Sequence, residues 1–166
     1  MIDRPELVRR VSEYCERAGL ELGPQLGYGV HGTVFSARNQ STSARSAVKV
    51  HDRERFYLRE RDVYRRLADE GVDSVLGFDV PRMLNSDDGL WVIEMTIASP
   101  PFVLDFAGAY LDEPSDYPED VLAEWDQEKR EQFGERWPTV QAILRRLQGF
   151  GVFLADVTPN NIRFAD

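Results

Sequence analysis

Residues 26–50 read LGYGVHGTVFSARNQSTSARSAVKV, and this stretch decides the fold class. Residues 33–37 are rich in the β-branched and aromatic side chains that strands prefer. A polar turn over 39–43 separates them from a further strand-like stretch at 44–50. The pattern predicts strand, glycine-rich loop, strand, turn, strand. The loop glycines are spaced G-x-G-x-x-G and are Gly27, Gly29 and Gly32.

Helical periodicity flanks this stretch on both sides. Residues 4–18 have helical spacing, with Asp3 as a candidate cap and Glu6 three residues further on, as in a capping box. Residues 53–69 also have helical spacing, and Asp52 is their candidate cap. A hairpin is predicted next, with strands at 80–84 and 90–96.

The residue pattern changes after the Ser99-Pro100-Pro101 sequence, which we take as the boundary between two lobes. Residues 102–117 show no clear periodicity, 119–134 predict a charged, solvated helix, and 138–150 predict an amphipathic helix. The predicted organisation is an N-terminal helix at 1–19, a first lobe at 20–98 and a second at 99–166.

Composition narrows the class of protein. The 166 residues are 42% hydrophobic and 30% charged, as in ordinary globular proteins, and carry a net charge of −9. Such a charge argues against nucleic acid or an anionic membrane as the main partner. A single cysteine, Cys15, excludes an intrachain disulfide, and no apolar run is long enough to span a bilayer. These features are compatible with a reducing cytoplasm.

The glycine loop allows two functional interpretations and a structural one. In dinucleotide-binding folds the same letters open a helix, but here they precede a strand, as in the loop that covers ATP in kinases. Val34 stands where that kinase pattern places a valine. An ordinary glycine hairpin remains the structural alternative.

Lys49 and Glu60 form a candidate ion pair. Lys49 lies in an apolar strand and therefore needs either solvent or a partner. Glu60 lies in the following helix on the face that carries Val63, Tyr64 and Leu67, so its carboxylate can reach Lys49. Glu54 is the rival, although its place in the first turn is explained by the helix dipole.

Asp156 and Asn161 have the D-x-x-x-x-N spacing of a phosphotransferase catalytic loop. In that loop the aspartate accepts the proton of the attacking hydroxyl and the asparagine binds Mg²⁺. The structural alternative is a Pro-Asn-Asn turn capped by an aspartate.

Taken together, the glycine loop, Lys49, Glu60 and the D-x-x-x-x-N segment resemble the motifs of the protein-kinase-like family, including its small bacterial members and the related small-molecule kinases. The resemblance covers roughly residues 20–165. It implies an α+β fold, with a kinase-like N-lobe made of an antiparallel five-stranded sheet and one helix, and a truncated, mainly helical C-lobe. It also implies ATP and Mg²⁺ as ligands, with the backbone of Glu94 and Met95 in the hinge that binds adenine.

The sequence departs from the family pattern at two places. Leu154 and Ala155 precede Asp156 where the family has His-Arg, which removes the usual partner of a phosphorylated activation loop. The D-F-G motif, whose aspartate binds Mg²⁺, is expected after Asn161, and only Ala165 and Asp166 follow there in its place. Asp166 would serve as that ligand only with an unusual backbone path.

Three interpretations follow from this pattern. The chain is an active minimal kinase that transfers the γ-phosphoryl group to a hydroxyl of a protein or small molecule, with Asp156 and Lys49 as catalytic residues. Alternatively, it is a pseudokinase that binds nucleotide or a protein partner, or a fragment completed by another chain or by self-association. The sequence predicts ATP binding with weak or absent turnover.

Overall fold

The computed structural model describes residues 2–114 and 116–166. Met1, at the start of the predicted N-terminal segment, and Ser115, in the predicted second lobe, lie outside the described residues. The described elements, in chain order, are α1 (Arg4–Ala18), β1 (Leu20–Gly29), β2 (Gly32–Asn39), β3 (Arg45–His51), α2 (Glu54–Asp69), β4 (Ser74–Val75), β5 (Phe78–Asp79), β6 (Met83–Asp87), β7 (Val92–Met95), β8 (Phe102–Val103), β9 (Tyr110–Leu111), α3 (Glu119–Phe133), the 3₁₀ turn η1 (Gly134–Arg136), α4 (Trp137–Gln148), β10 (Val152–Phe153) and β11 (Ile162–Arg163).

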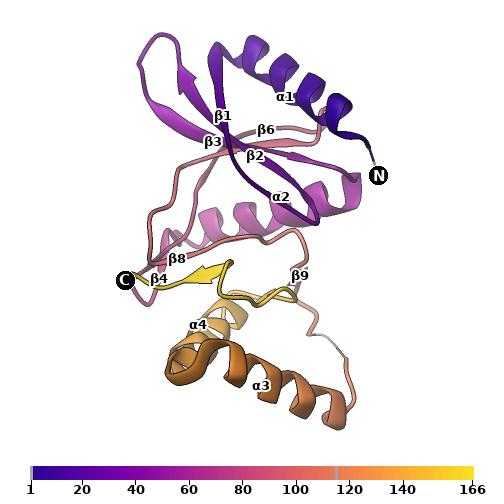
Figure 1. Cartoon of the computed structure of the whole chain (residues 1–166), viewed down its shortest axis with the longest axis vertical. Coiled ribbons are helices and arrows are strands. Elements are labelled where there is room, and N and C mark those ends of the chain that lie inside the picture. The colour runs from indigo at the N-terminus through magenta and orange to yellow at the C-terminus, as the bar shows by residue number, and fades with distance from the viewer. Residues whose placement is uncertain (1, 115) are drawn as a thin grey trace.

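A five-stranded sheet dominates the first half of the chain. Its strand order is β1-β2-β3-β7-β6, and every neighbouring pair is antiparallel. Helix α1 covers one face of the sheet and α2 covers the other (Figure 1). The predicted α+β class and five-stranded antiparallel sheet are therefore confirmed.

Alternation along β3 divides the core between these two faces. Val48 and Val50 belong to the cluster of apolar residues beneath α1, whereas Ala47 belongs to the larger cluster that includes the apolar face of α2. Because successive side chains of a strand point to opposite faces, Lys49 and His51 share the α2 side with Ala47. The only lysine of the sheet therefore faces the helix that carries Glu60.

Helix α1 begins and ends where the sequence predicts. The Asp3 carboxylate accepts a hydrogen bond from the Glu6 backbone N–H at 3.0 Å, which satisfies one of the free donors at the helix start. Gly19 ends the helix in a left-handed conformation with φ of 68°. Both signals act within one turn, which explains why this helix was predictable.

The cap predicted for the second helix is wrong. Arg53 occupies the N-cap position of α2, with no capping hydrogen bond from its side chain. Strand β3 continues to His51, and the backbone N–H of Asp52 donates to the His31 carbonyl at 3.4 Å. Asp52 is therefore still held beside the sheet, one residue too early to cap the helix.

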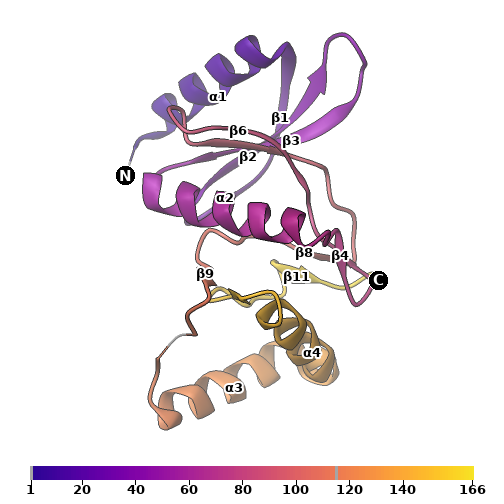
Figure 2. The same ribbon diagram turned by 180° about the vertical axis from the view of Figure 1, so that it is seen from behind.

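The chain from β8 onwards lies below α2 (Figures 1 and 2). Two short pairings, β8 with β11 and β9 with β10, lie between α2 and the pair of helices α3 and α4. Residues 102–117, in which the sequence shows no clear periodicity, contain two strands of two residues each. Strand β9 pairs with β10 about 40 positions later. Strand β8 pairs with β11 about 60 positions later and with β5 earlier in the chain, so no local periodicity marks either strand.

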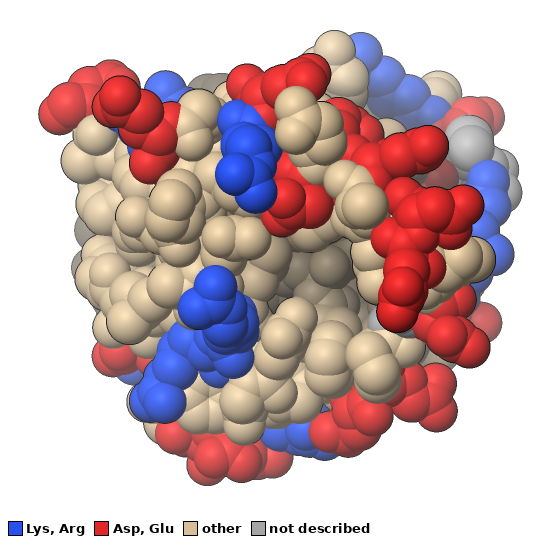
Figure 3. Space-filling model, turned by 90° about the horizontal axis from the view of Figure 1, so that it is seen from below, with Lys and Arg blue, Asp and Glu red and all other residues tan. Residues whose placement is uncertain are grey.

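The surface below α3 and α4 is strongly charged. Seen from below, acidic side chains gather towards one side, with fewer basic groups and an uncharged hollow between them (Figure 3). None of the helices within residues 2–114 and 116–166 has the length and apolar character needed to span a membrane.

Candidate functional site

A buried charged cluster lies between β3, α2 and the segment that follows β8. We call it the Lys49 cluster, and its members are Lys49, His51, Glu60 and Asp105. The Lys49 Nζ lies 2.7 Å from Glu60 Oε2 and 3.1 Å from Asp105 Oδ1. The structure thus brings Lys49 and Glu60 together, whereas Glu54 is exposed in the first turn of α2.

The electrostatics of the cluster keep Lys49 and Glu60 ionised. Burial by itself would raise the pKa of Glu60, but the charge of Lys49 and the hydrogen bonds from His51 and Lys49 outweigh it and lower the pKa to about 2. Burial by itself would lower the pKa of Lys49, but Glu60 and Asp105 outweigh it and raise the pKa. The ammonium and the Glu60 carboxylate are therefore both charged at neutral pH.

Asp105 is the residue that the sequence analysis missed. It belongs to the sequence Asp105-Phe106-Ala107-Gly108, directly after β8. Its backbone is left-handed, with φ of 65°, which is uncommon outside glycine and recurs at functional sites. Phe106 is fully buried, and its ring meets Tyr64 of α2 edge-on at 5.4 Å between centroids. The aspartate is thus anchored by its neighbour in the core.

Asp156 and Asn161 lie in the loop between β10 and β11. Asn161 Nδ2 donates to the carboxylate of Asp156 at 2.9 Å and to the carbonyl oxygen of the same residue at 3.2 Å. The Asn161 backbone N–H donates to the Thr158 carbonyl at 3.0 Å. The two side chains named from the D-x-x-x-x-N spacing therefore face each other across a tight loop.

Backbone pairing joins this loop to the segment of Asp105. The strand before Asp105 pairs antiparallel with the strand after Asn161, with Val103 opposite Ile162. The Leu104 N–H then donates to the Asn161 carbonyl at 2.7 Å. Asp105 therefore follows a residue that is bonded directly to Asn161, although the two lie more than fifty positions apart in the chain.

The glycine loop lies close to Asp105. A Cβ added to Gly27 would meet nothing within 4 Å, and a Cβ added to Gly29 would meet only Asp105 Oδ2, at 3.8 Å. Packing within the protein therefore explains neither glycine, and the missing side chain of Gly29 leaves room beside Asp105. Gly32 differs, because its added Cβ would lie 2.3 Å from the Val50 carbonyl oxygen, so close packing against β3 requires a glycine there.

The segment after Asp105 touches both loops. A Cβ added to Gly108 would lie 3.7 Å from His31 Nε2 of the glycine loop and 4.0 Å from the Ala155 side chain. The glycine loop, the Asp105 segment and the loop of Asp156 thus converge on one place.

The residues predicted for the hinge are placed differently from one another. Glu94 points towards α1, where it accepts a hydrogen bond from the Tyr14 hydroxyl at 2.8 Å. Met95 is buried on the α2 side, with its sulfur 3.6 Å from the Tyr64 hydroxyl. Val34, which pairs with Lys49 across β2 and β3, packs against the same core as Met95. Any contact of Glu94 with a nucleotide would therefore use its backbone and not its carboxylate.

Asp166 lines a hollow of about 390 Å³ on the side of η1, together with residues from the end of α3 and from β11. No member of the Lys49 cluster lines this hollow. The geometry therefore places Asp105, and not Asp166, beside Lys49 and next to the backbone of Asn161.

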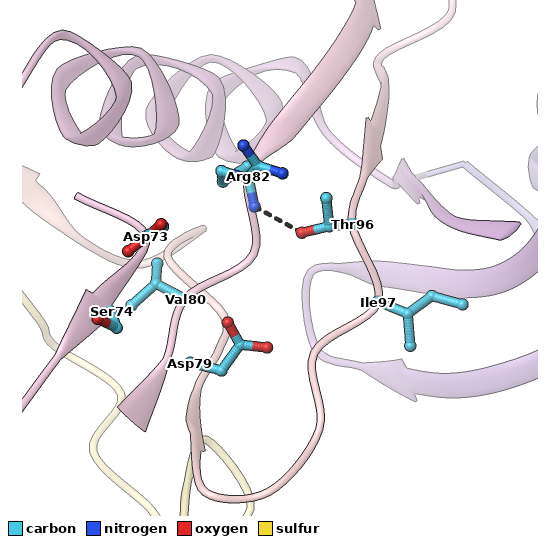
Figure 4. A pocket seen from close by; sticks show the side chains of 7 residues that line it. All are labelled: Asp73, Ser74, Asp79, Val80, Arg82, Thr96 and Ile97. Carbon is cyan, nitrogen blue, oxygen red and sulfur yellow. Dashed lines mark hydrogen bonds between the residues drawn. The ribbon is translucent and has the colours of Figure 1, made fainter. Parts of the chain in front are cut away.

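A larger hollow, of about 450 Å³, opens elsewhere on the protein (Figure 4). It lies between the β4–β5 hairpin and the end of β7, and Arg82 donates its backbone N–H to the Thr96 hydroxyl at 2.9 Å across it. Its lining includes the carboxylates of Asp73 and Asp79 but no member of the Lys49 cluster. Size alone therefore does not make it the reactive site.

The donor set beside the glycine loop suits Mg²⁺ bound to phosphates. Within residues 2–114 and 116–166 no group of three or more histidine, cysteine or acidic side chains is arranged to hold a metal by itself. Mg²⁺ is, however, usually held by one or two carboxylates together with substrate phosphates. Asp105 and Asn161, whose segments are joined by the Leu104 to Asn161 backbone hydrogen bond, are oxygen-bearing side chains that would fit this role.

The sequence contained a signal for Asp105 that the expected order of motifs concealed. An apolar pair, Val103-Leu104, precedes Asp-Phe, and a glycine follows at 108, one position later than in D-F-G. The family pattern places the metal-binding aspartate after the catalytic-loop asparagine, whereas Asp105 precedes Asn161 in the chain.

No family model matches this chain, and no curated protein matches it in sequence.

Proposed function

We propose that this protein is a kinase-like, ATP-dependent phosphotransferase with an unusual order of motifs along the chain. The observation that carries the proposal is the position of Lys49 between Glu60 and Asp105, at 2.7 and 3.1 Å. Kinases use such a lysine–glutamate pair on the phosphates and an aspartate on Mg²⁺. The order of strands in the sheet and the single helix on the Lys49 side support a kinase-like N-lobe.

In this proposal each residue of the site has a separate role in phosphoryl transfer. Lys49 contacts the phosphates of ATP while Glu60 orients its ammonium, and the open space at Gly27 and Gly29 lets backbone amides approach the same phosphates. Asp105 and Asn161 would hold Mg²⁺, which neutralises the charge that develops on the phosphates.

Asp156 would accept the proton of the attacking hydroxyl, from a protein or a small-molecule acceptor. Its carboxylate is held by Asn161 Nδ2 at 2.9 Å, which fixes its orientation in the loop. The net charge of −9 favours an acceptor other than nucleic acid.

Asp105 changes the expectation about turnover. Weak or absent transfer was expected because the second metal-binding aspartate was missing after Asn161. If Asp105 supplies this carboxylate from an earlier position in the chain, the set needed for transfer is complete in residues 27–161. We therefore favour an active enzyme.

A nucleotide-binding pseudokinase is the second candidate. The observation that favours it is the departure from the family pattern before Asp156, where Leu154 and Ala155 stand in place of His-Arg. In this alternative ATP binds at Lys49 but the acceptor hydroxyl never reaches Asp156.

The test is a calorimetric titration with ATP, with and without Mg²⁺, on wild type, Lys49→Met and Lys129→Met. Lys129 is the other lysine of the chain and lies on α3. We expect Lys49→Met to weaken ATP binding roughly 10- to 100-fold, as for loss of a charge-assisted hydrogen bond, and Lys129→Met to leave it unchanged. Absence of saturable binding by wild type would refute both candidates, and binding without hydrolysis or transfer would favour the pseudokinase.

A further inference from the structure

His51 is a buried ionisable side chain that no motif of the sequence explains. It is fully buried on the α2 side of β3, two positions after Lys49. Its Nε2 lies 2.6 Å from Glu60 Oε2, the same carboxylate oxygen that lies 2.7 Å from Lys49 Nζ. One oxygen of Glu60 therefore has two nitrogen partners.

The opposite side of the imidazole faces a second acceptor. His51 Nδ1 lies 3.1 Å from the Trp91 carbonyl oxygen, which also accepts the His51 backbone N–H at 3.0 Å. A carbonyl oxygen has no proton to give, so Nδ1 must be the donor in this contact. Trp91 itself is left-handed, with φ of 55°, which is a strained conformation for a bulky residue. The turn is thus held in a rare conformation in which this carbonyl receives two hydrogen bonds from His51.

Glu60 then determines the state of the second nitrogen. Its carboxylate shares an oxygen with the Lys49 ammonium, and its pKa is lowered to about 2, so it is ionised and can only accept. A neutral imidazole has one donor and one acceptor nitrogen, and in this pocket its acceptor would face a carboxylate or a carbonyl. Only the imidazolium satisfies both contacts.

With His51 as an imidazolium, the charges of the Lys49 cluster are balanced. The Lys49 cluster then contains two cations and two anions, which is the condition under which buried charges persist. The other ionisable groups near the imidazole are Tyr57, whose ring is edge-on with 5.7 Å between centroids, and the adjacent Asp52, which is also buried.

We propose that His51 is a positioning residue that, as a buried imidazolium, holds the Glu60 carboxylate in place and so directs the Lys49 ammonium towards Asp105 and the phosphates. Two cations on one carboxylate fix its orientation better than one, because Glu60 stays paired when Lys49 turns to a ligand. This inference rests on the proposed function for its catalytic consequence, whereas the protonation of His51 is a property of the free protein.

The first experiment is NMR of the nucleotide-free protein labelled with ¹⁵N. The chain has two histidines and two lysines, so His31→Gln and Lys129→Arg assign the spectra of His51 and Lys49 by elimination. We expect both ring nitrogens of His51 to carry slowly exchanging protons at pH 7, because each nitrogen faces an acceptor. A His51 with one unprotonated nitrogen at pH 7 would overturn the proposal without any reference to ATP.

The second experiment compares His51→Gln, which keeps an amide donor, with His51→Leu, which keeps none. In both variants the Lys49 Nζ signal of the nucleotide-free protein should shift, and the shift should be larger in His51→Leu. The kcat for phosphate transfer should fall roughly 10- to 100-fold with a smaller change in KM, as for misplacement of a catalytic group. His51→Gln should recover part of the loss. An unchanged Lys49 signal and unchanged kcat in a folded His51→Leu protein would refute the positioning role.

These outcomes separate this inference from the proposed function. If wild type binds no ATP but His51 is an imidazolium, the phosphotransferase proposal fails and the charged pairing stands. If wild type transfers phosphate while His51 is neutral, the function stands and the inference fails.

Discussion

Replacing Glu60 by glutamine removes the carboxylate that compensates Lys49 and His51, so its cost can be worked out from the structure. Glu60 is fully buried and its pKa is lowered from 4.5 to about 2. A pKa difference of this size between folded and unfolded chains corresponds to about 3 kcal/mol of stabilisation by the ionised form. Breaking a buried ion pair by removing one partner costs a similar amount, about 3–5 kcal/mol.

The pH dependence of this effect has a definite sign. Because the pKa of Glu60 is lower in the folded protein than in the unfolded chain, its stabilisation is fully present above about pH 4.5. It is lost progressively as the pH falls towards about 2. The stability difference between wild type and Glu60→Gln should therefore shrink as the pH falls below about 4.5.

The assay is urea unfolding followed by tryptophan fluorescence, repeated at steps from pH 7 to 3. We expect Glu60→Gln to lower the free energy of unfolding by about 3 kcal/mol at pH 7, which corresponds to a fall in Tm of about 6–12 °C for a chain of this size. Glu54→Gln is the matched control, because it makes the same change in the exposed first turn of α2 and should cost less than about 1 kcal/mol. Equal losses for the two variants, or a Glu60 effect that persists unchanged at pH 3, would refute this account of the cluster.

Three further predictions concern nucleotide binding and transfer. Asp105→Asn should remove the effect of Mg²⁺ on ATP binding by calorimetry while Asp166→Asn leaves it intact, and the reverse result would restore Asp166 as the metal ligand. Gly29→Ala should weaken ATP binding with little change in Tm because its Cβ would fill only the space beside Asp105, whereas Gly32→Ala should lower Tm by its collision with the backbone of β3. Asp156→Asn should abolish phosphate transfer from labelled ATP and preserve ATP affinity, so transfer at the wild-type rate would remove Asp156 from the mechanism.

Local chemistry explains the parts of this fold that could be predicted. The bounds of α1 depend on Asp3 capping Glu6 and on Gly19, which lie within or directly beside the helix. The strands around the glycine loop follow from β-branched residues and a polar turn. The pairing of Lys49 with Glu60 was also accessible, because helical and strand periodicity place both side chains at the interface of α2 and the sheet.

The sequence by itself determined the α+β class, the sheet with its glycine loop, and the charged residues that need a partner because they lie on apolar elements. Only the tertiary structure decided which aspartate stands beside Lys49, because the pairing of β8 with β11 joins segments separated by some sixty residues through two-residue strands that no periodicity marks. It also decided the state of His51, whose two acceptors come from α2 and from a turn forty residues away. Proximity of this kind depends on packing of the whole chain, whereas periodicity and capping report only on neighbours within a few residues.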